Sequence, residues 1–126
     1  CSPGWTRHHG DCYQYFKDVS SFTVAEKSCQ DLGGIMAASK TQEEVDFLSS
    51  LRPKTAKIWI GLTDRAEEGT FKWLDGSSVV WDNWAEGSPN GQYGHEDCVV
   101  MYGEQVNSKW NDHPCSSQHY QYPFIC

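Results

Sequence analysis

The spacing of hydrophobic and polar residues predicts strands near the start of the chain and throughout its second half. Residues 12–16 alternate in the manner of a strand, with Tyr13 and Tyr15 on one face. After Pro53 the apolar residues come in short runs, and Asp75 with Gly76 marks a turn between two of them. These runs predict strands over 58–63, 71–74, 79–81, 98–102 and 120–126.

A first helix is expected between the opening strand and the later ones. Thr23 and Glu26 form a capping-box pattern, which predicts that the helix begins at this threonine. The helix then continues past Cys29 and Leu32 and stops at the glycine pair that starts with Gly33.

A second helix repeats the same signals. Thr41 and Glu44 form another capping box, and Pro53 sets the end of the helix. Its apolar side is formed by Val45, Leu48 and Leu51.

Residues 82–97 differ from the rest, because they combine glycines and a proline with acidic and amide side chains and offer little to bury. Loops of this length in a small domain are uncommon unless they are functional or disordered. Trp81 and Trp84 at the entrance, with a cysteine just after the loop, favour an ordered functional loop.

The length of 126 residues fits one domain spanning 1–126. Ten basic and 17 acidic side chains give a net charge of −7, which argues against binding to nucleic acid or to anionic membrane surfaces. The longest apolar runs are about five residues, against roughly 18 for a bilayer-spanning helix, so no insertion into a membrane is expected.

The six cysteines form an even set without a Cys-x-x-Cys pair. This pattern argues against zinc ribbons and redox motifs and favours disulfides formed in an oxidising compartment. We therefore expect a secreted or extracellular protein, although spacing alone does not choose among the possible pairings.

Carboxylate and amide side chains gather in the second half of the chain. Such oxygens suit Ca²⁺, and the absence of an EF-hand run means that a site would be assembled from distant loops. From composition alone, acidic surface loops are the simpler interpretation. The residues concerned are Asp64, Glu67, Glu68, Asn90, Glu96, Asp97, Asn111 and Asp112.

Other chemistry has less support. His95, His113 and His119 lack the close spacing of a zinc motif, which favours solvated loop histidines, and His8 with His9 is interpreted as surface polarity. No Gly-x-Ser-x-Gly elbow is present, and no free cysteine is expected, so nucleophilic catalysis has no support. The mixture of Asn, Asp and Glu favours metal ligation over a glycosidase carboxylate pair.

Several short motifs together resemble the C-type lectin domain. They are Trp59-Ile60-Gly61-Leu62, Glu96-Asp97-Cys98-Val99, Trp110-Asn111-Asp112, Cys115 and Phe124-Ile125-Cys126. The resemblance covers essentially all 126 residues and implies an α+β fold with two helices, small antiparallel sheets and a long loop region. It also implies the long form of the domain, with the disulfides Cys1–Cys12, Cys29–Cys126 and Cys98–Cys115.

In sugar-binding members of this family, Ca²⁺ bridges the protein and the sugar. Carried onto this chain, the resemblance implies sugar-site ligands at Asn90, Glu96, Asn111 and Asp112. A second, structural ion would be held by Asp64, Glu68, Glu96 and Asp97. Pro89 fits the family's cis-proline position, whereas Gly91 stands where the structural site often has a further oxygen ligand.

Ser88 departs from the family pattern. Relatives carry Glu-Pro-Asn for mannose-type sugars or Gln-Pro-Asp for galactose-type sugars, and this chain has Ser88-Pro89-Asn90. Because a serine hydroxyl is shorter and uncharged, weaker Ca²⁺ binding is expected. Asn90 favours mannose-type ligands, while Tyr93 could stack on the apolar face of galactose, so the sugar stays open.

The sequence therefore predicts a non-enzymatic, calcium-dependent lectin that recognises terminal monosaccharides of glycans. Single sites of this kind bind weakly, so a noncovalent homo-oligomer is expected to supply avidity. The alternative is a protein-binding domain of the same fold with a degenerate sugar site. Ser88 favours that alternative, and the surviving oxygen ligands argue against it. A regular threonine or acidic array for binding ice or mineral is not seen.

Overall fold

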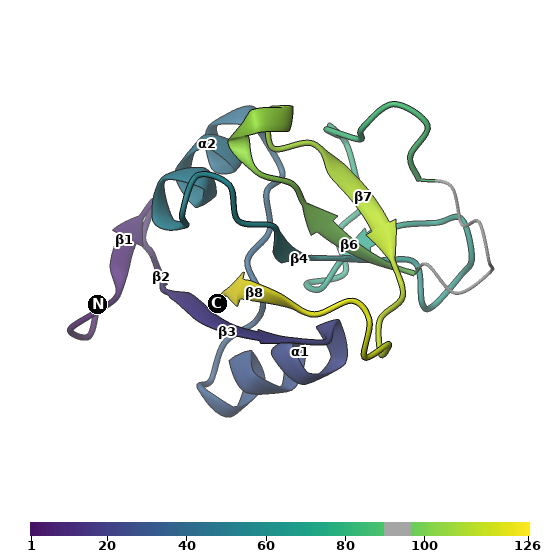
Figure 1. Ribbon diagram of the computed structural model, residues 1–126. Helices are drawn as coiled ribbons and strands as arrows, with labels where there is room; N and C mark the ends of the chain where they lie inside the picture. Colours follow the sequence, from purple (N-terminus) through teal and green to yellow (C-terminus); the bar gives the residue numbers. More distant parts are fainter. Residues whose placement is uncertain (90–96) are drawn as a thin grey trace.

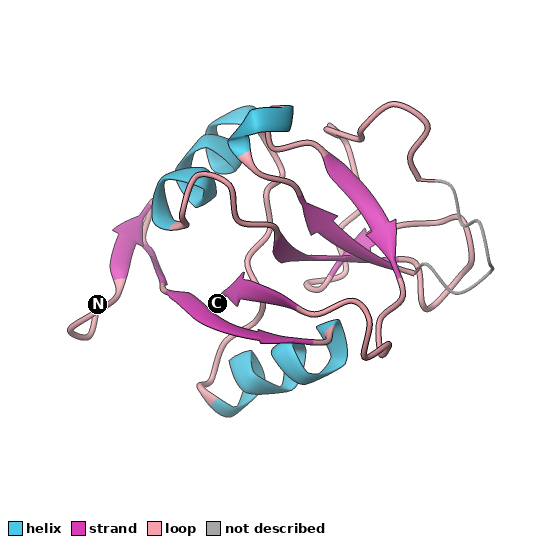
Figure 2. Ribbon diagram, in the orientation of Figure 1, coloured by secondary structure: helices cyan, strands magenta, loops and turns pink. Residues whose placement is uncertain are grey.

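The computed structural model describes residues 1–89 and 97–126, and in it a central sheet lies between two helices (Figure 1). The sheet has the strand order β3-β8-β4-β6-β7, with β5 paired to β4, and a separate hairpin joins β1 to β2. Helices α1 (Phe22–Asp31) and α2 (Gln42–Leu51) lie on opposite sides of the sheet (Figure 2). The strands are β1 (Thr6–His8), β2 (Asp11–Tyr13), β3 (Tyr15–Ser20), β4 (Ile58–Thr63), β5 (Lys72–Trp73), β6 (Cys98–Met101), β7 (Trp110–His113) and β8 (Tyr122–Ile125).

Strand β4 is the middle of the core because both of its faces are buried. Ile58, Ile60 and Leu62 share a hydrophobic cluster with Val45 and Leu48 of α2. Trp59 points the other way and joins the cluster that contains residues of α1. The alternation of side chains along a strand thus lets one segment hold both helices.

The beginning of α1 differs from the sequence prediction. Ser21, and not Thr23, is the N-cap, and its side chain accepts a hydrogen bond from Val24 N at 3.3 Å. Thr23 instead lies within the first turn, where its hydroxyl meets Ser116 Oγ at 2.9 Å. Both serine and threonine are good caps, so local sequence did not separate them. The predicted end is confirmed, since Gly33 adopts a φ of 82° just after the helix.

Helix α2 agrees with its prediction at both ends. Thr41 is the N-cap, and its Oγ1 accepts a hydrogen bond from Glu44 N at 3.1 Å. The Glu44 carboxylate reaches back to Lys40 N at 3.4 Å. The helix ends at Leu51, before Pro53.

Two strand predictions need correction. The segment 12–16 is divided between β2 and β3, and 79–81 is not a strand, because Val80 is 97% exposed and has no sheet face to bury against. Strand β4 is confirmed, while the predicted strands 71–74, 98–102 and 120–126 are shortened to β5, β6 and β8. The sheet is antiparallel except between β4 and β8, which run parallel where Trp59 meets Phe124.

Three disulfides close the fold, and they join the pairs that the family resemblance implied. Cys29–Cys126 ties α1 to the end of the chain, and Cys98–Cys115 ties the start of β6 to the segment after β7. Cys1–Cys12 closes the N-terminal hairpin. Among the described residues, none of the helices combines the length and apolar character needed to cross a membrane.

We predict that Gly61→Ala destabilises the fold by about 1–3 kcal/mol, as overpacking does elsewhere. A Cβ at this position would lie 2.6 Å from the Met36 carbonyl oxygen, which belongs to the backbone and has little room to move. Chemical denaturation of the variant measures the cost. Gly34→Ala is the matched control, since its Cβ would meet nothing closer than 3.9 Å. Equal stability of the two variants would contradict the predicted close approach.

Candidate functional site

The carboxylates of Asp64 and Asp97 meet because β4 and β6 are antiparallel neighbours. Thr63 at the end of β4 pairs with Cys98 at the start of β6. One residue further out, Asp64 N donates a hydrogen bond to the Asp97 carbonyl at 3.0 Å. The two aspartates therefore lie side by side at one end of the sheet.

Glu68 completes a group of three carboxylates. One oxygen each of Asp64, Glu68 and Asp97 lies within 4.8 Å of the others. Gly69 N donates to Asp64 Oδ2 at 2.8 Å, whereas Asp64 Oδ1 and Asp97 Oδ1 are buried without a hydrogen-bond partner among the described residues. Arg65 pairs with Glu26 instead of with this group. Unpartnered buried carboxylate oxygens are the donors that a hard cation such as Ca²⁺ prefers.

The three carboxylates oppose one another's ionisation. The pKa of Glu68 is raised to about 7, first by its hydrogen bond with Asp97 and then by the charge of Asp64. The pKa of Asp64 is raised mainly by burial, and Asp97 adds to the effect. A divalent cation would have the opposite effect, because it favours the ionised forms.

A second group of oxygens lies on the neighbouring strand β7. Asn111 and Asp112 stand in register with Val100 and Val99 of β6, so they are at the same end of the sheet as Asp97. Asn111 Oδ1 accepts hydrogen bonds from Ser88 Oγ at 2.5 Å and from Asp112 N at 3.0 Å. Asp112 is almost wholly buried.

The Asn111 amide is held by a network on its nitrogen side. Its Nδ2 donates to the Tyr102 hydroxyl at 2.7 Å and lies 3.1 Å from His113 Nε2. Burial lowers the pKa of His113, which favours the neutral imidazole. Since Nε2 then accepts from Asn111, the ring proton is on Nδ1 and points to the Tyr122 hydroxyl at 2.9 Å. The network fixes the direction of the Asn111 oxygen.

Tryptophans position the entrance of the long loop beside β7. The backbone of Trp84 forms an isolated parallel β-bridge with Trp110, and Ala85 N donates a hydrogen bond to the Trp110 carbonyl at 2.9 Å. The rings of the two tryptophans meet edge to face at 5.6 Å. This contact brings the loop alongside β7 and so carries Ser88 to Asn111. The Ser88–Pro89 peptide bond is cis, as the family position implied.

The structure thus places the predicted residues in two groups. Asp64, Glu68 and Asp97 form the first, and Ser88, Asn111 and Asp112 form the second. The predicted ligands Asn90 and Glu96 and the predicted sugar contact Tyr93 lie outside the described residues.

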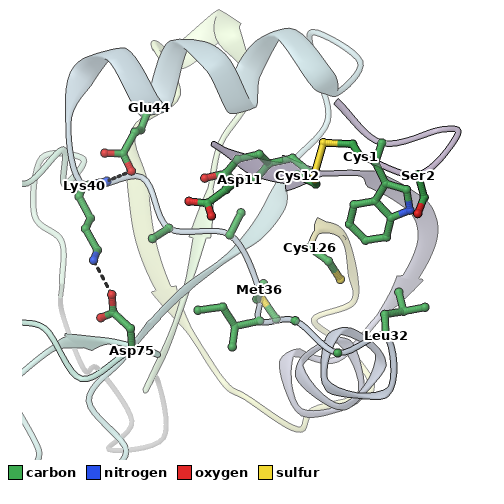
Figure 3. Close-up of a pocket in the computed structure, with 17 residues that line it drawn as sticks. Cys1, Ser2, Asp11, Cys12, Leu32, Met36, Lys40, Glu44, Asp75 and Cys126 are labelled. Carbon is green, nitrogen blue, oxygen red and sulfur yellow. Dashed lines mark hydrogen bonds and ion pairs between the residues drawn. A yellow bond between two sulfur atoms is a disulfide. The ribbon is translucent and has the colours of Figure 1, made fainter. Parts of the chain in front are cut away.

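A cavity of about 750 Å³ lies away from both groups, between the N-terminal hairpin and the segment that joins α1 to α2 (Figure 3). Trp5 and Met36 contribute to its apolar wall. At one end Lys40 pairs with Asp75 at 2.5 Å, and the Lys40 backbone N–H donates to Glu44 (Figure 3). Because these charged groups are paired and no predicted ligand lines the cavity, we do not assign the site to it.

Sequence comparison shows the class of protein. The chain matches the family model of the lectin C-type domain over residues 18–126. It is 36% identical over 134 residues to an alpha-N-acetylgalactosamine-specific lectin of Patiria pectinifera, covering 98% of this chain and 77% of that protein. The chain therefore belongs to the C-type lectin domain family.

Solved structures agree with this assignment. The carbohydrate-recognition domain of cow CD23, determined in the presence of a GlcNAc2Man3 oligosaccharide, has a TM-score of 0.88 at 32% identity and covers 100% of this chain and 93% of that one. A calcium-independent type II antifreeze protein also has a TM-score of 0.88, at 27% identity, over 100% of this chain and 92% of that one. The same fold thus occurs in a carbohydrate-recognition domain and in an antifreeze protein.

We predict that Glu68→Gln raises the melting temperature of the protein in EDTA at about pH 8, because it removes one of three mutually repelling charges. The raised pKa of Glu68 gives the direction of the pH effect. The three carboxylates repel one another above about pH 7, and the repulsion falls as Glu68 becomes protonated at lower pH. The advantage of the variant should therefore shrink as the pH falls. Thermal unfolding across pH measures it, with the neighbouring Glu67→Gln as control. An equal rise in that control would contradict a specific effect of the cluster.

Proposed function

We propose that this protein is a calcium-dependent lectin that recognises terminal monosaccharides of glycans. The observation that carries the proposal is the placement of two oxygen-rich groups around the neighbouring strands β4, β6 and β7, in a chain of the C-type lectin family. The first group is not explained by packing alone, since two of its carboxylate oxygens are buried without partners among the described residues.

In this proposal the two groups have different tasks. Asp64, Glu68 and Asp97, with Glu96, hold a structural Ca²⁺ at the base of the loop. Asn111 and Asp112, with Asn90 and Glu96, hold the sugar-site Ca²⁺, which when bound takes two vicinal hydroxyls of a monosaccharide into its coordination shell. The same amide and carboxylate groups hydrogen-bond the neighbouring sugar hydroxyls and so select their stereochemistry.

We expect Ser88 to determine how tightly the sugar site binds Ca²⁺. Its hydroxyl donates to the Asn111 oxygen at 2.5 Å, which supports a place beside the proposed ligands. It supplies no charge, and fewer charged ligands mean weaker Ca²⁺ binding. The sugar belongs to the mannose or galactose type. Asn90 favours the first, while Tyr93 and the N-acetylgalactosamine-specific relative favour the second.

The proposal also includes the extracellular location of the protein and its association into oligomers. The three disulfides favour an oxidising, extracellular setting for a single domain that binds and does not catalyse. Because one sugar site binds weakly, noncovalent association into a homo-oligomer would supply the avidity.

A second candidate function is binding to a protein through a degenerate sugar site. The Ser88 hydrogen bond favours it, because that bond uses the Asn111 oxygen that a metal would need. The antifreeze protein of similar fold is described as calcium-independent, which shows that the fold is also used without this ion.

A glycan array in Ca²⁺, in EDTA and after return of Ca²⁺ separates the two candidates. We expect signal on a defined set of glycans that EDTA abolishes and Ca²⁺ alone restores. Asp112→Asn should lose most of this signal with little change in folding, because it removes a charged ligand. Asp82→Asn makes the same change at an exposed position of the loop and should bind normally. A blank array at millimolar Ca²⁺ would favour the protein-binding function.

We further predict that Ser88→Glu tightens Ca²⁺ binding by about tenfold or more, since it adds a charged ligand where relatives carry one. It should also shift the array toward mannose-type glycans. Calorimetric titration with Ca²⁺ measures the affinity, and Ser88→Gln controls for side-chain length without the charge. Unchanged affinity in Ser88→Glu would mean that position 88 lies outside the coordination sphere.

A further inference from the structure

The N-terminal hairpin brings two histidine rings together. Strand β1 ends at His8, which pairs with Asp11 of β2 across a two-residue turn of His9 and Gly10. Both turn residues have positive φ, 49° and 87°, as type I′ hairpin turns require. Successive residues of a strand point to opposite faces, but here the two ring centroids are only 4.2 Å apart.

Helix α2 supplies a carboxylate to the same place. Glu43 lies in the first turn of the helix, and its Oε1 contacts His9 Nε2 and is 3.6 Å from His8 Nε2. Phe47, one turn further along, stacks on the His8 ring at 4.0 Å with nearly parallel planes. Glu43 and Phe47 are four residues apart, so the helix presents them on the same face. The stacking on Phe47 therefore holds the His8 ring beside the Glu43 carboxylate.

The three groups are close enough to reach one metal ion, although His9 and Glu43, which are in direct contact, must move apart to admit it. Their ligand atoms all lie within 4.8 Å of one another. Two ligands of a tetrahedral Zn²⁺ are roughly 3.4 Å apart, given metal–ligand bonds of about 2.0–2.2 Å. The His8–Glu43 distance of 3.6 Å is close to this value and too long for a hydrogen bond. His8 Nε2 is also buried without a hydrogen-bond partner among the described residues.

We propose that His8, His9 and Glu43 form a zinc-binding site, with one Nε2 atom from each imidazole, one carboxylate oxygen and a water as the four ligands. Two imidazoles and a carboxylate are a known zinc ligand set. Ca²⁺ does not suit this site, because it requires about six to eight oxygens and only Glu43 offers them here. The ion joins the hairpin to α2 and is independent of the proposed calcium sites.

A proton is the competing occupant of this cluster. Glu43 forms an ion pair with His9, and in a purely structural role that pair would simply fasten the hairpin to the helix. The two roles differ in their response to metal, because an ion pair gains nothing from Zn²⁺, whereas a binding site takes up one equivalent and loses its protons.

Calorimetric titration of the full chain with Zn²⁺, in saturating Ca²⁺, tests the proposal. We expect uptake of one equivalent, and Co²⁺ in place of Zn²⁺ should give the visible absorption of a tetrahedral site. His9→Asn and Glu43→Gln should each weaken Zn²⁺ binding at least tenfold. Asparagine tolerates the positive φ of the turn, and Glu43 is exposed, so both variants should fold.

His119→Asn is the matched control, since this exposed histidine belongs to the segment between β7 and β8. Its zinc affinity should equal that of the unchanged protein. No uptake of Zn²⁺, or unchanged affinity in either His9→Asn or Glu43→Gln, overturns the proposal. Because EDTA also removes Zn²⁺, returning Ca²⁺ alone to EDTA-treated protein separates this site from the calcium-dependent function.

Discussion

The register between β4 and β6 is the constraint on which the site depends. It pairs Thr63 with Cys98, and the hydrogen bond from Asp64 N to the Asp97 carbonyl continues that pairing beyond the strands. A slip of one residue would turn each of these side chains to the other face of the sheet. The register itself is held by burial, since Ile60 and Val99 pair within the core. Packing inside the sheet therefore decides where the carboxylates stand outside it.

The same register extends to the second oxygen group through β7. Val99 of β6 pairs on one side with Ile60 and on the other with Asp112, so a buried valine connects the core to the proposed sugar site. The Cys98–Cys115 disulfide ties the start of β6 to the segment just after β7. Asp64 and Asp97 directly adjoin paired strands, and Asn111 and Asp112 lie within β7, which suits a site whose ligands must hold fixed positions.

Local sequence signals predicted α2 and β4 well because several of them agree there. The cap at Thr41, the apolar face of the helix and Pro53 all give the same boundaries, and β4 is a continuous apolar run. The failures come where local signals compete or where the context is tertiary. Ser21 and Thr23 are both good caps, and Val80 has strand-like neighbours but no partner strand.

The carboxylate and amide residues of the site could be identified from their chemistry and from the family resemblance. Which of them lie together could not be predicted without the pairing of the strands. Asp64 and Asp97 are far apart in the chain and become neighbours only through the β4–β6 pairing. The cluster of His8, His9 and Glu43 was missed because it is also assembled from distant parts of the chain, the N-terminal hairpin and α2. Glu43 is 34 residues from His9, and the turn conformation that gathers the two rings has no clear signature in a His-His-Gly sequence.

The carboxylate cluster also links ion binding to stability. The neighbouring carboxylates raise the pKa of Glu68 to about 7. Ionisation of the cluster therefore destabilises the folded state as the pH rises through this value. A cation that binds only the folded protein would stabilise it, and this stabilisation would increase with the concentration of the cation. Asp64 follows β4 and Asp97 precedes β6, so the stabilisation would act on the contact that closes the base of the long loop. In the proposed lectin, calcium would therefore stabilise the base of the loop as well as contact the sugar.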